Sequence, residues 1–171
     1  MQKTYYCPDL LWETIEEIDG VLNLKRAKDK NVQALFTSTP FLKGETIIQF
    51  SANEILERPT YLTVQTGPDR HITLEPQFLQ YINHSCDPNI IFDVDQMMII
   101  AIKDIGNGEE LKFFYPSTEW EMDQPFICNC GSSQCLGLIS GALAIDSDAR
   151  HRYQVSNYIK SKWSESDQRK V

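Results

Sequence analysis

Four of the five cysteines lie in two separated stretches, YINHSCDPN at 81–89 and FICNCGSSQCLG at 126–137. The second stretch has the spacing Cys-x-Cys-x₄-Cys, and Gly131 lets that segment fold back as a tight loop. A structural Zn²⁺ site takes four soft ligands at tetrahedral corners, with no position left for water or substrate. Three ligands are predicted on this loop, with Cys86 as the available fourth thiol. The four residues are Cys86, Cys128, Cys130 and Cys135.

The spacing of the cysteines alone leaves other uses of these thiols open. Clustered cysteines also occur in redox sites, and some are simply free thiols. His84 and Cys86, two residues apart on extended chain, present their side chains to the same face and would suit a base and a nucleophile. No oxyanion motif accompanies them, and a metal would occupy the thiolate. Cys7 is left over and is interpreted as a small buried hydrophobe.

The chain of 171 residues is expected to form one domain with its own core, because 42% of its residues are hydrophobic and 11% are aromatic. It has no apolar run of 18 residues and its N-terminal stretch lacks the apolar region of a secretory signal. We therefore expect an intracellular protein of the cytoplasm or nucleus, without membrane contact. A reducing compartment favours metal binding over disulfides.

Charge is distributed unevenly along the chain. The net charge is −8, yet residues 146–171 carry six Lys and Arg against four Asp and Glu, a balance of +2, so residues 1–145 carry −10. An acidic body repels phosphate backbones, which argues against direct binding to nucleic acid. It attracts a basic partner such as a Lys-containing protein or peptide, although the charge also serves solubility.

The patterning predicts a mostly β chain with helix near its two ends. Short runs rich in β-branched and aromatic residues predict strands at 21–27, 32–38, 45–50, 61–66, 71–74, 89–94, 97–103 and 110–115. Turns are expected at Asp95-Gln96 and at 106–108. A helix capped by Asp9 is predicted over 9–18, with Leu11, Ile15 and Ile18 on one face. A second is predicted over 147–163, with the apolar stripe Val155, Tyr158, Ile159 and Trp163.

Three motifs together resemble the SET-domain protein lysine methyltransferases that carry a post-SET zinc segment. They are NHSCDPN at 83–89, GEELKFFY at 108–115 and the cysteine loop at 126–137, and FTSTPFLKGETI at 36–47 is similar to the N-terminal part of that family. The resemblance implies a SET domain over 22–118, a post-SET zinc segment over 126–137 and a helical C-terminal extension over 138–171. The implied fold consists of small curved sheets with a threaded, pseudoknot-like C-terminal segment.

The resemblance also implies an activity and its residues. The expected reaction transfers methyl groups from S-adenosylmethionine (SAM) to a lysine side chain of a histone or other protein, with one structural Zn²⁺. Tyr115 is the expected catalytic-site tyrosine. The candidates for cofactor binding are Asn83, His84, Tyr115, Trp120 and Phe126. Phe113 takes the position that influences the number of methyl groups, where Phe implies capacity for di- or trimethylation.

Two departures from the family pattern bear on activity. Val32, Gln33 and Ala34 stand where the family has Gly-x-Gly beside SAM, unless the loop at 28–31 compensates, and Phe50 and Ala52 stand where it often has Tyr and Gly. A catalytically degenerate module that binds a basic peptide without methyl transfer is therefore the alternative function. The C-terminal extension is expected to pack on the body, with a dimer or partner interface as its alternative.

Overall fold

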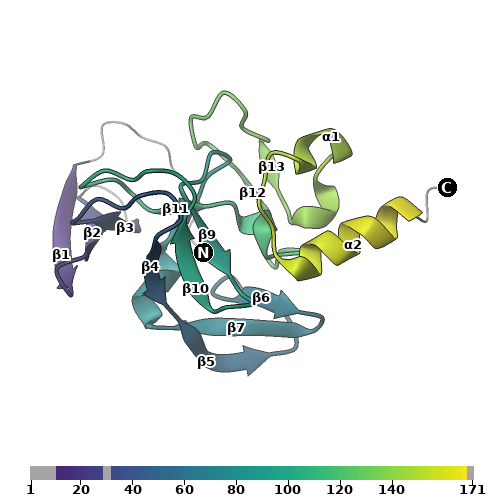
Figure 1. Ribbon diagram of the computed structural model, residues 1–171, viewed down its shortest axis with the longest axis horizontal. Coiled ribbons are helices and arrows are strands. Elements are labelled where there is room, and N and C mark those ends of the chain that lie inside the picture. The colour runs from purple at the N-terminus through teal and green to yellow at the C-terminus, as the bar shows by residue number, and fades with distance from the viewer. Residues whose placement is uncertain (1–10, 29–31, 169–171) are drawn as a thin grey trace.

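In the part of the chain that the structure describes, five small sheets are joined to a helical C-terminal extension (Figure 1). The structure is a computed structural model that describes residues 11–28 and 32–168. The strands are β1 (Trp12–Ile18), β2 (Leu22–Ala27), β3 (Gln33–Thr37), β4 (Thr46–Gln49), β5 (Ser51–Leu56), β6 (Val64–Gly67), β7 (Arg70–Glu75), β8 (Asn83–His84), β9 (Ile90–Asp93), β10 (Met98–Ala101), β11 (Lys112–Phe113), β12 (Phe126–Ile127) and β13 (Leu138–Ile139). The 3₁₀ turns are η1 (Gln77–Tyr81), η2 (Tyr115–Ser117) and η3 (Ala142–Ala144), and the α-helices are α1 (Ser147–Arg150) and α2 (Asn157–Gln168).

The sheets are small because each joins only two or three strands. Antiparallel pairing builds the sheets β1-β2-β3, β4-β10-β9 and β5-β7-β6, and β12 pairs with β13 across the cysteine loop. The sheet β8-β11 is parallel, with Lys112 opposite Asn83 and Phe113 opposite His84. Next to it, the Leu111 amide donates to the Leu35 carbonyl of β3 at 2.8 Å. The segment that ends in Tyr115 thus lies between β3 and β8.

The helix predicted over 9–18 is wrong, because residues 12–18 form the edge strand β1. β1 pairs with β2 along its length, and a bulge between Thr14 and Glu16 interrupts the register. The expected apolar face is not buried as a unit, since Leu11 and Ile15 are exposed while Ile18 is buried. Pairing with β2 supplied the hydrogen bonds that an isolated helical turn would have made, which overrides a weak helical pattern. The proposed Asp9 cap lies outside the described residues, as does Cys7.

Most of the predicted strands are confirmed with small shifts of their ends. The run 110–115 is strand only at β11, because the chain enters η2 at Tyr115. β5 was not predicted, and neither were the two-residue strands β8, β12 and β13. β5 is an edge strand whose residues are mostly exposed, so it lacks the alternation that marks a half-buried strand.

The helix predicted over 147–163 is two helices with a bend between them. At the bend the Ser156 amide donates to the Ser117 carbonyl at 2.9 Å, so the chain meets the segment after Tyr115. The Ser156 hydroxyl accepts from the Ile159 amide at 3.3 Å at the start of α2. Ile159 and Trp163 are buried in a cluster with Phe114 and Ala142, so the apolar stripe packs on the body.

The larger core joins the sheets around Phe92, Phe113 and Tyr115, and a smaller cluster surrounds the cysteines. In the described residues, none of the helices is long and apolar enough to cross a membrane.

Candidate active site and metal centre

The pairing of β8 with β11 brings the two sequence motifs together. Asn83 and His84 form β8, and the chain leaves β11 directly into Tyr115. The Ser85 amide donates to the Phe113 carbonyl at 3.0 Å, which continues the pairing beyond the two strands. Residues about 30 positions apart in sequence therefore share one small, buried site.

Tyr115 is fully buried and held by two hydrogen bonds. Its hydroxyl donates to the Ile82 carbonyl at 3.1 Å, and its amide donates to His84 Nδ1 at 3.2 Å. Burial raises the pKa of the Tyr115 phenol well above its usual range, with a further contribution from Glu110. The phenol therefore stays neutral and acts through its dipole and its ring.

Phe113 is part of a row of rings that leads to Tyr115. Its ring centroid lies 4.7 Å from that of Tyr115 and 4.5 Å from that of Phe92. Phe50, one of the two departures from the family pattern, extends the row because its centroid lies 5.4 Å from that of Phe92. Such tilted and edge-on contacts favour a rigid apolar wall.

Asn83 is fixed against the segment that departs most from the family pattern. Its side-chain amide donates to the Gln33 carbonyl at 3.2 Å and to Glu110 Oε1 at 3.0 Å. Val32 and Ala34 are both buried, whereas Gln33 is half-buried. The side chains at the positions of the expected glycines are therefore shielded from solvent, with Ala34 on the face of β3 opposite to the core residue Leu35.

Phe126 and Trp120 lie in different surroundings. The Phe126 ring lies 5.5 Å from that of His84 and 6.0 Å from that of Tyr115, so it joins the site. Trp120 packs instead with the cluster of the C-terminal extension, where Lys162 Nζ lies 5.3 Å from its ring centroid. Its amide donates to Gln65 Oε1 at 2.9 Å.

The four predicted cysteine ligands come together in one cluster. Their sulfur atoms all lie within 4.8 Å of one another, and the sulfurs of Cys86 and Cys128 are 3.9 Å apart. A tetrahedral zinc site with Zn–S bonds of about 2.3 Å requires sulfurs roughly 3.8 Å apart. The hydrogen bond from Cys86, and then burial, raises the pKa of Cys128, so a cation is needed to hold four thiolates together. The cluster can hold a metal ion, and its donor set fits zinc.

His84 connects the cysteine cluster to Tyr115. Its Nδ1 accepts the Tyr115 amide, so in the neutral ring the proton is on Nε2, which lies 3.4 Å from the Cys86 sulfur. Burial lowers the pKa of His84 to about 3. A neutral imidazole that already donates toward the sulfur is a poor base for that thiol, which argues against a nucleophile pair.

Comparison with known proteins decides the family. Residues 33–116 match the model of the SET domain. Methyltransferase flvH of Aspergillus flavus is 39% identical to this chain over 150 residues, covering 86% of this chain and 80% of that protein. The chain belongs to the SET-domain methyltransferase family.

Other SET-domain relatives are much larger proteins. The H3 lysine-4 specific histone-lysine N-methyltransferase of Aspergillus fumigatus is 41% identical over 68 residues, which are 36% of this chain and 6% of that protein. Histone-lysine N-methyltransferase 2D of Homo sapiens is 41% identical over 63 residues, 33% of this chain and 1% of that protein. This chain therefore spans a small part of these two relatives.

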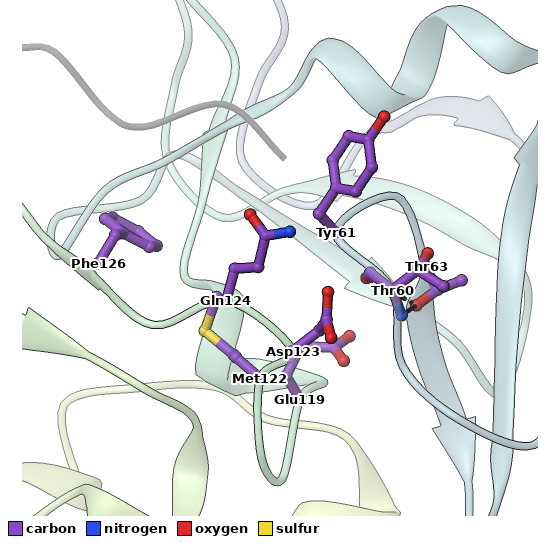
Figure 2. A pocket seen from close by; sticks show the side chains of 8 residues that line it. All are labelled: Thr60, Tyr61, Thr63, Glu119, Met122, Asp123, Gln124 and Phe126. Atoms are coloured by element: carbon purple, nitrogen blue, oxygen red, sulfur yellow. Dashed lines mark hydrogen bonds between the residues drawn. The ribbon is translucent and has the colours of Figure 1, made fainter.

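Trp120, Phe126 and the three clustered tail cysteines lie beyond the part that matches the SET-domain model, which ends at residue 116. A pocket lies between this segment and residues within the match, lined by Thr60, Tyr61, Thr63, Glu119, Met122, Asp123, Gln124 and Phe126 (Figure 2). Sequence reasoning missed Glu119 and its neighbour His71. Both are buried polar residues that belong to no motif, and only the packing of β6 and β7 against the segment after Tyr115 reveals them.

Proposed function

We propose that this SET-domain protein transfers methyl groups from SAM to the side-chain amine of lysine in a basic protein. The single observation that supports this most is the placement of Tyr115, a neutral phenol at the end of a row of rings, with hydroxyl and amide both fixed. Positioning of the reacting groups supplies much of the rate of an in-line displacement. The two hydrogen bonds of Tyr115 hold its ring and its hydroxyl in one position.

The surroundings of Tyr115 fit such a reaction without a general base. SAM supplies a methyl group on a sulfonium, and the amine nitrogen forms its new bond as the carbon–sulfur bond breaks. Because the Tyr115 hydroxyl proton points to the Ile82 carbonyl, its oxygen lone pairs are left to accept from the amine or the methyl group. His84 Nδ1 is already occupied by the Tyr115 amide. The lysine must therefore lose its proton to water before it reacts, and an apolar wall of Phe113 and Phe126 disfavours the ammonium form.

We also propose that Asn83, His84, Tyr115 and Phe126 bind SAM, whereas Trp120, which packs with the C-terminal extension, is a candidate from the family resemblance alone. The Phe126 ring supports this, because it lies 5.5 Å from that of His84 and 6.0 Å from that of Tyr115. Asn83 ties Gln33 to this place through its amide. Cys86, Cys128, Cys130 and Cys135 would bind one structural Zn²⁺, which would fasten the tail over the site.

The substrate class and the product follow from charge and from Phe113. An acidic body of this size favours a basic protein or peptide over nucleic acid. Phe113 has no hydroxyl to hold a water beside the amine, which leaves room for a second and third methyl group. Aromatic faces also attract the methylated cations that form, by roughly 0.5–2 kcal/mol per ring.

Calorimetry with SAM tests this function against the degenerate binding module. An active enzyme binds SAM with a defined stoichiometry, in wild type and in Tyr115→Phe alike, and loses turnover in the variant. A protein that binds basic peptides but gives no heat with SAM would be the non-catalytic module. The same titration with Asn83→Ala is expected to weaken SAM binding.

A further inference from the structure

Glu110, in the motif at 108–115, binds the side chain of Asn83 in the candidate SAM site. Glu110 Oε1 accepts from the Asn83 side-chain amide at 3.0 Å, and that amide also donates to the Gln33 carbonyl at 3.2 Å. Because both partners are acceptors, they fix the nitrogen end of the carboxamide and use both of its N–H groups. Asn83 therefore keeps only its side-chain oxygen for a ligand, while the Glu110 carboxylate holds the other end of the same group.

The carboxylate of Glu110 is held in a partly buried place. The side chain of Glu110 is 19% exposed. Its backbone is fixed as well, because its carbonyl accepts from the Asn89 side-chain amide at 2.9 Å and the residue forms a β-bridge with Phe36. A carboxylate held in this way does not turn freely out to solvent, and water screens its charge less than that of a surface group.

The charge of Glu110 reaches Tyr115. Burial, and then the negative charge of Glu110, raises the pKa of the Tyr115 phenol, because both disfavour a phenolate. The interaction that disfavours an anion at this place favours a cation there by Coulomb's law. In the proposed function that cation is the sulfonium of SAM, whose methyl group must come to Tyr115. Glu110 is therefore placed to act on the charge at the reacting end of the cofactor.

Lys112 compensates part of this charge. Its Nζ lies 3.1 Å from Glu110 Oε2, and its side chain is 30% exposed. Water weakens ion pairs that have an exposed partner, so Lys112 does not cancel the field of Glu110 toward the buried Tyr115. The two residues thus act on the site with opposite signs, and each can be removed separately.

We propose that Glu110 makes the site select SAM over S-adenosylhomocysteine (SAH), the product that remains after methyl transfer. SAM carries a positive sulfonium, whereas SAH carries an uncharged thioether at the same atom. Glu110 attracts the sulfonium and loses this attraction once the methyl group has left, so the site favours exchange of SAH for fresh SAM. Glu110 is a positioning residue, which acts through Asn83 and through its charge. Its role rests on the proposed function for the presence of SAM.

Calorimetric titration with SAM and, separately, with SAH measures this selection without a methyl-accepting protein. Glu110→Gln removes the charge and keeps the size of the side chain and an oxygen for the Asn83 amide. It is expected to weaken SAM binding by about fivefold and SAH binding by less than about twofold. Glu109→Gln, at the neighbouring exposed carboxylate, is the matched control and should leave both affinities unchanged.

Lys112→Met tests the same charge with the opposite sign. It removes the compensating ammonium and keeps an unbranched side chain of similar length. The ratio of SAM affinity to SAH affinity should rise by about threefold in this variant, because the field of Glu110 is then uncompensated. A residue that only supported the fold would not improve the binding of one ligand relative to the other.

Equal losses of SAM and SAH affinity in Glu110→Gln would overturn the proposal, because a residue that only holds Asn83 affects both ligands alike. A ratio of affinities that stays constant or falls in Lys112→Met would overturn it as well, and this variant decides alone if Glu110→Gln does not fold. A wild type that binds neither ligand would contradict the proposed function, and the role of Glu110 with it. A wild type that binds both, with a ratio that neither variant changes, keeps that function and removes only the role of Glu110.

Discussion

Tyr115 is held by hydrogen bonds at its amide and at its hydroxyl. Its function should therefore be sensitive to the loss of the single hydroxyl oxygen. Its amide is held by His84 and its hydroxyl by the Ile82 carbonyl, so the ring cannot turn without breaking a buried hydrogen bond. Tyr115→Phe removes only the hydroxyl and leaves the ring row in place. We expect the rate of methyl transfer to fall roughly 100-fold or more, as for loss of one preorganised polar group at a reacting centre. Tyr153→Phe, whose hydroxyl donates to the Cys86 carbonyl at 3.2 Å, serves as the comparison and should keep most of the activity.

Phe113 offers a test of the product. Phe113→Tyr places a hydroxyl within the row of rings beside Tyr115, where it would hold a water and restrict the space for methyl groups. The product measured by mass spectrometry should change from di- and trimethyl-lysine to monomethyl-lysine. Phe114→Tyr is the matched control, because Phe114 stacks on Tyr153 at 3.7 Å in the neighbouring cluster. Monomethyl product alone from the wild type, even after long incubation, would contradict the role of Phe113.

Glu119 predicts a pH dependence of stability with a definite sign. Burial raises its pKa from 4.5 to about 7, so the native state holds a proton that the unfolded chain releases. The Glu119 contribution to the free energy of unfolding is therefore full below pH 4.5 and is lost as the pH rises to 7, by on the order of 3 kcal/mol. Chemical denaturation at several pH values should show this loss in the wild type relative to Glu119→Gln. The difference in the free energy of unfolding between the two proteins isolates the effect of Glu119, since both keep His71 and His84. A difference that stays constant across pH 4.5–7 would refute the predicted role of Glu119.

At the level of elements, the C-terminal extension holds the segment that follows Tyr115. The Ala142 amide donates to the Glu119 carbonyl at 2.8 Å, and the Leu143 amide donates to the Trp120 carbonyl at 3.1 Å. The residue before them, Gly141, has a φ of 122°, and a Cβ on it would lie 2.4 Å from the Trp120 oxygen. This close approach explains why only glycine fits there.

Gly141→Ala is expected to lower the free energy of unfolding by at least about 2 kcal/mol, from backbone strain and the clash together. Gly20→Ala is a suitable comparison, because Gly20 also has a positive φ, of 68°, but has nothing within 4 Å of an added Cβ. It should cost about 1 kcal/mol from strain alone. Urea denaturation measures both, and equal losses would mean that the contact with Trp120 does not matter.

Local sequence patterns predicted the strands in which apolar and polar residues alternate. They also predicted the turns between strands that are close in sequence. The hairpin of β9 and β10 around Asp95-Gln96 is an example. β1 was predicted as a helix because its pairing with β2 is tertiary and does not show in its own apolar spacing. The cysteine ligands and Tyr115 were predicted from spaced motifs, but Glu119 was not. Its burial depends on β6, through the Gln65 amide, and no local pattern in the sequence encodes that contact.

On the scale of the whole molecule, the cysteine cluster and the extension act on the same site. Cys86 carries both connections, since its sulfur lies near His84 Nε2 and its carbonyl accepts from the Tyr153 hydroxyl. The Leu136 amide also donates to the Cys86 sulfur at 3.4 Å. Loss of the metal should therefore disturb Tyr115 and the tail together.

Cys86→Ser is expected to abolish binding of the proposed zinc ion and to lower the free energy of unfolding by about 3 kcal/mol or more. Elemental analysis of the purified protein and thermal denaturation with and without a chelator measure both effects. Ser133→Ala, in the same loop but without a ligand atom for zinc, is the control and should keep one zinc per chain. A wild-type protein that contains no zinc would contradict the assignment of the cluster.

The most direct measurement is transfer of radiolabelled methyl groups from SAM to proteins of a mixed extract, followed by acid hydrolysis and separation of the amino acids. The wild type should place label in methylated lysine, and Tyr115→Phe should place little or none there. A wild-type protein that is folded, contains its zinc and binds SAM, but leaves no label on lysine, would contradict the proposed function.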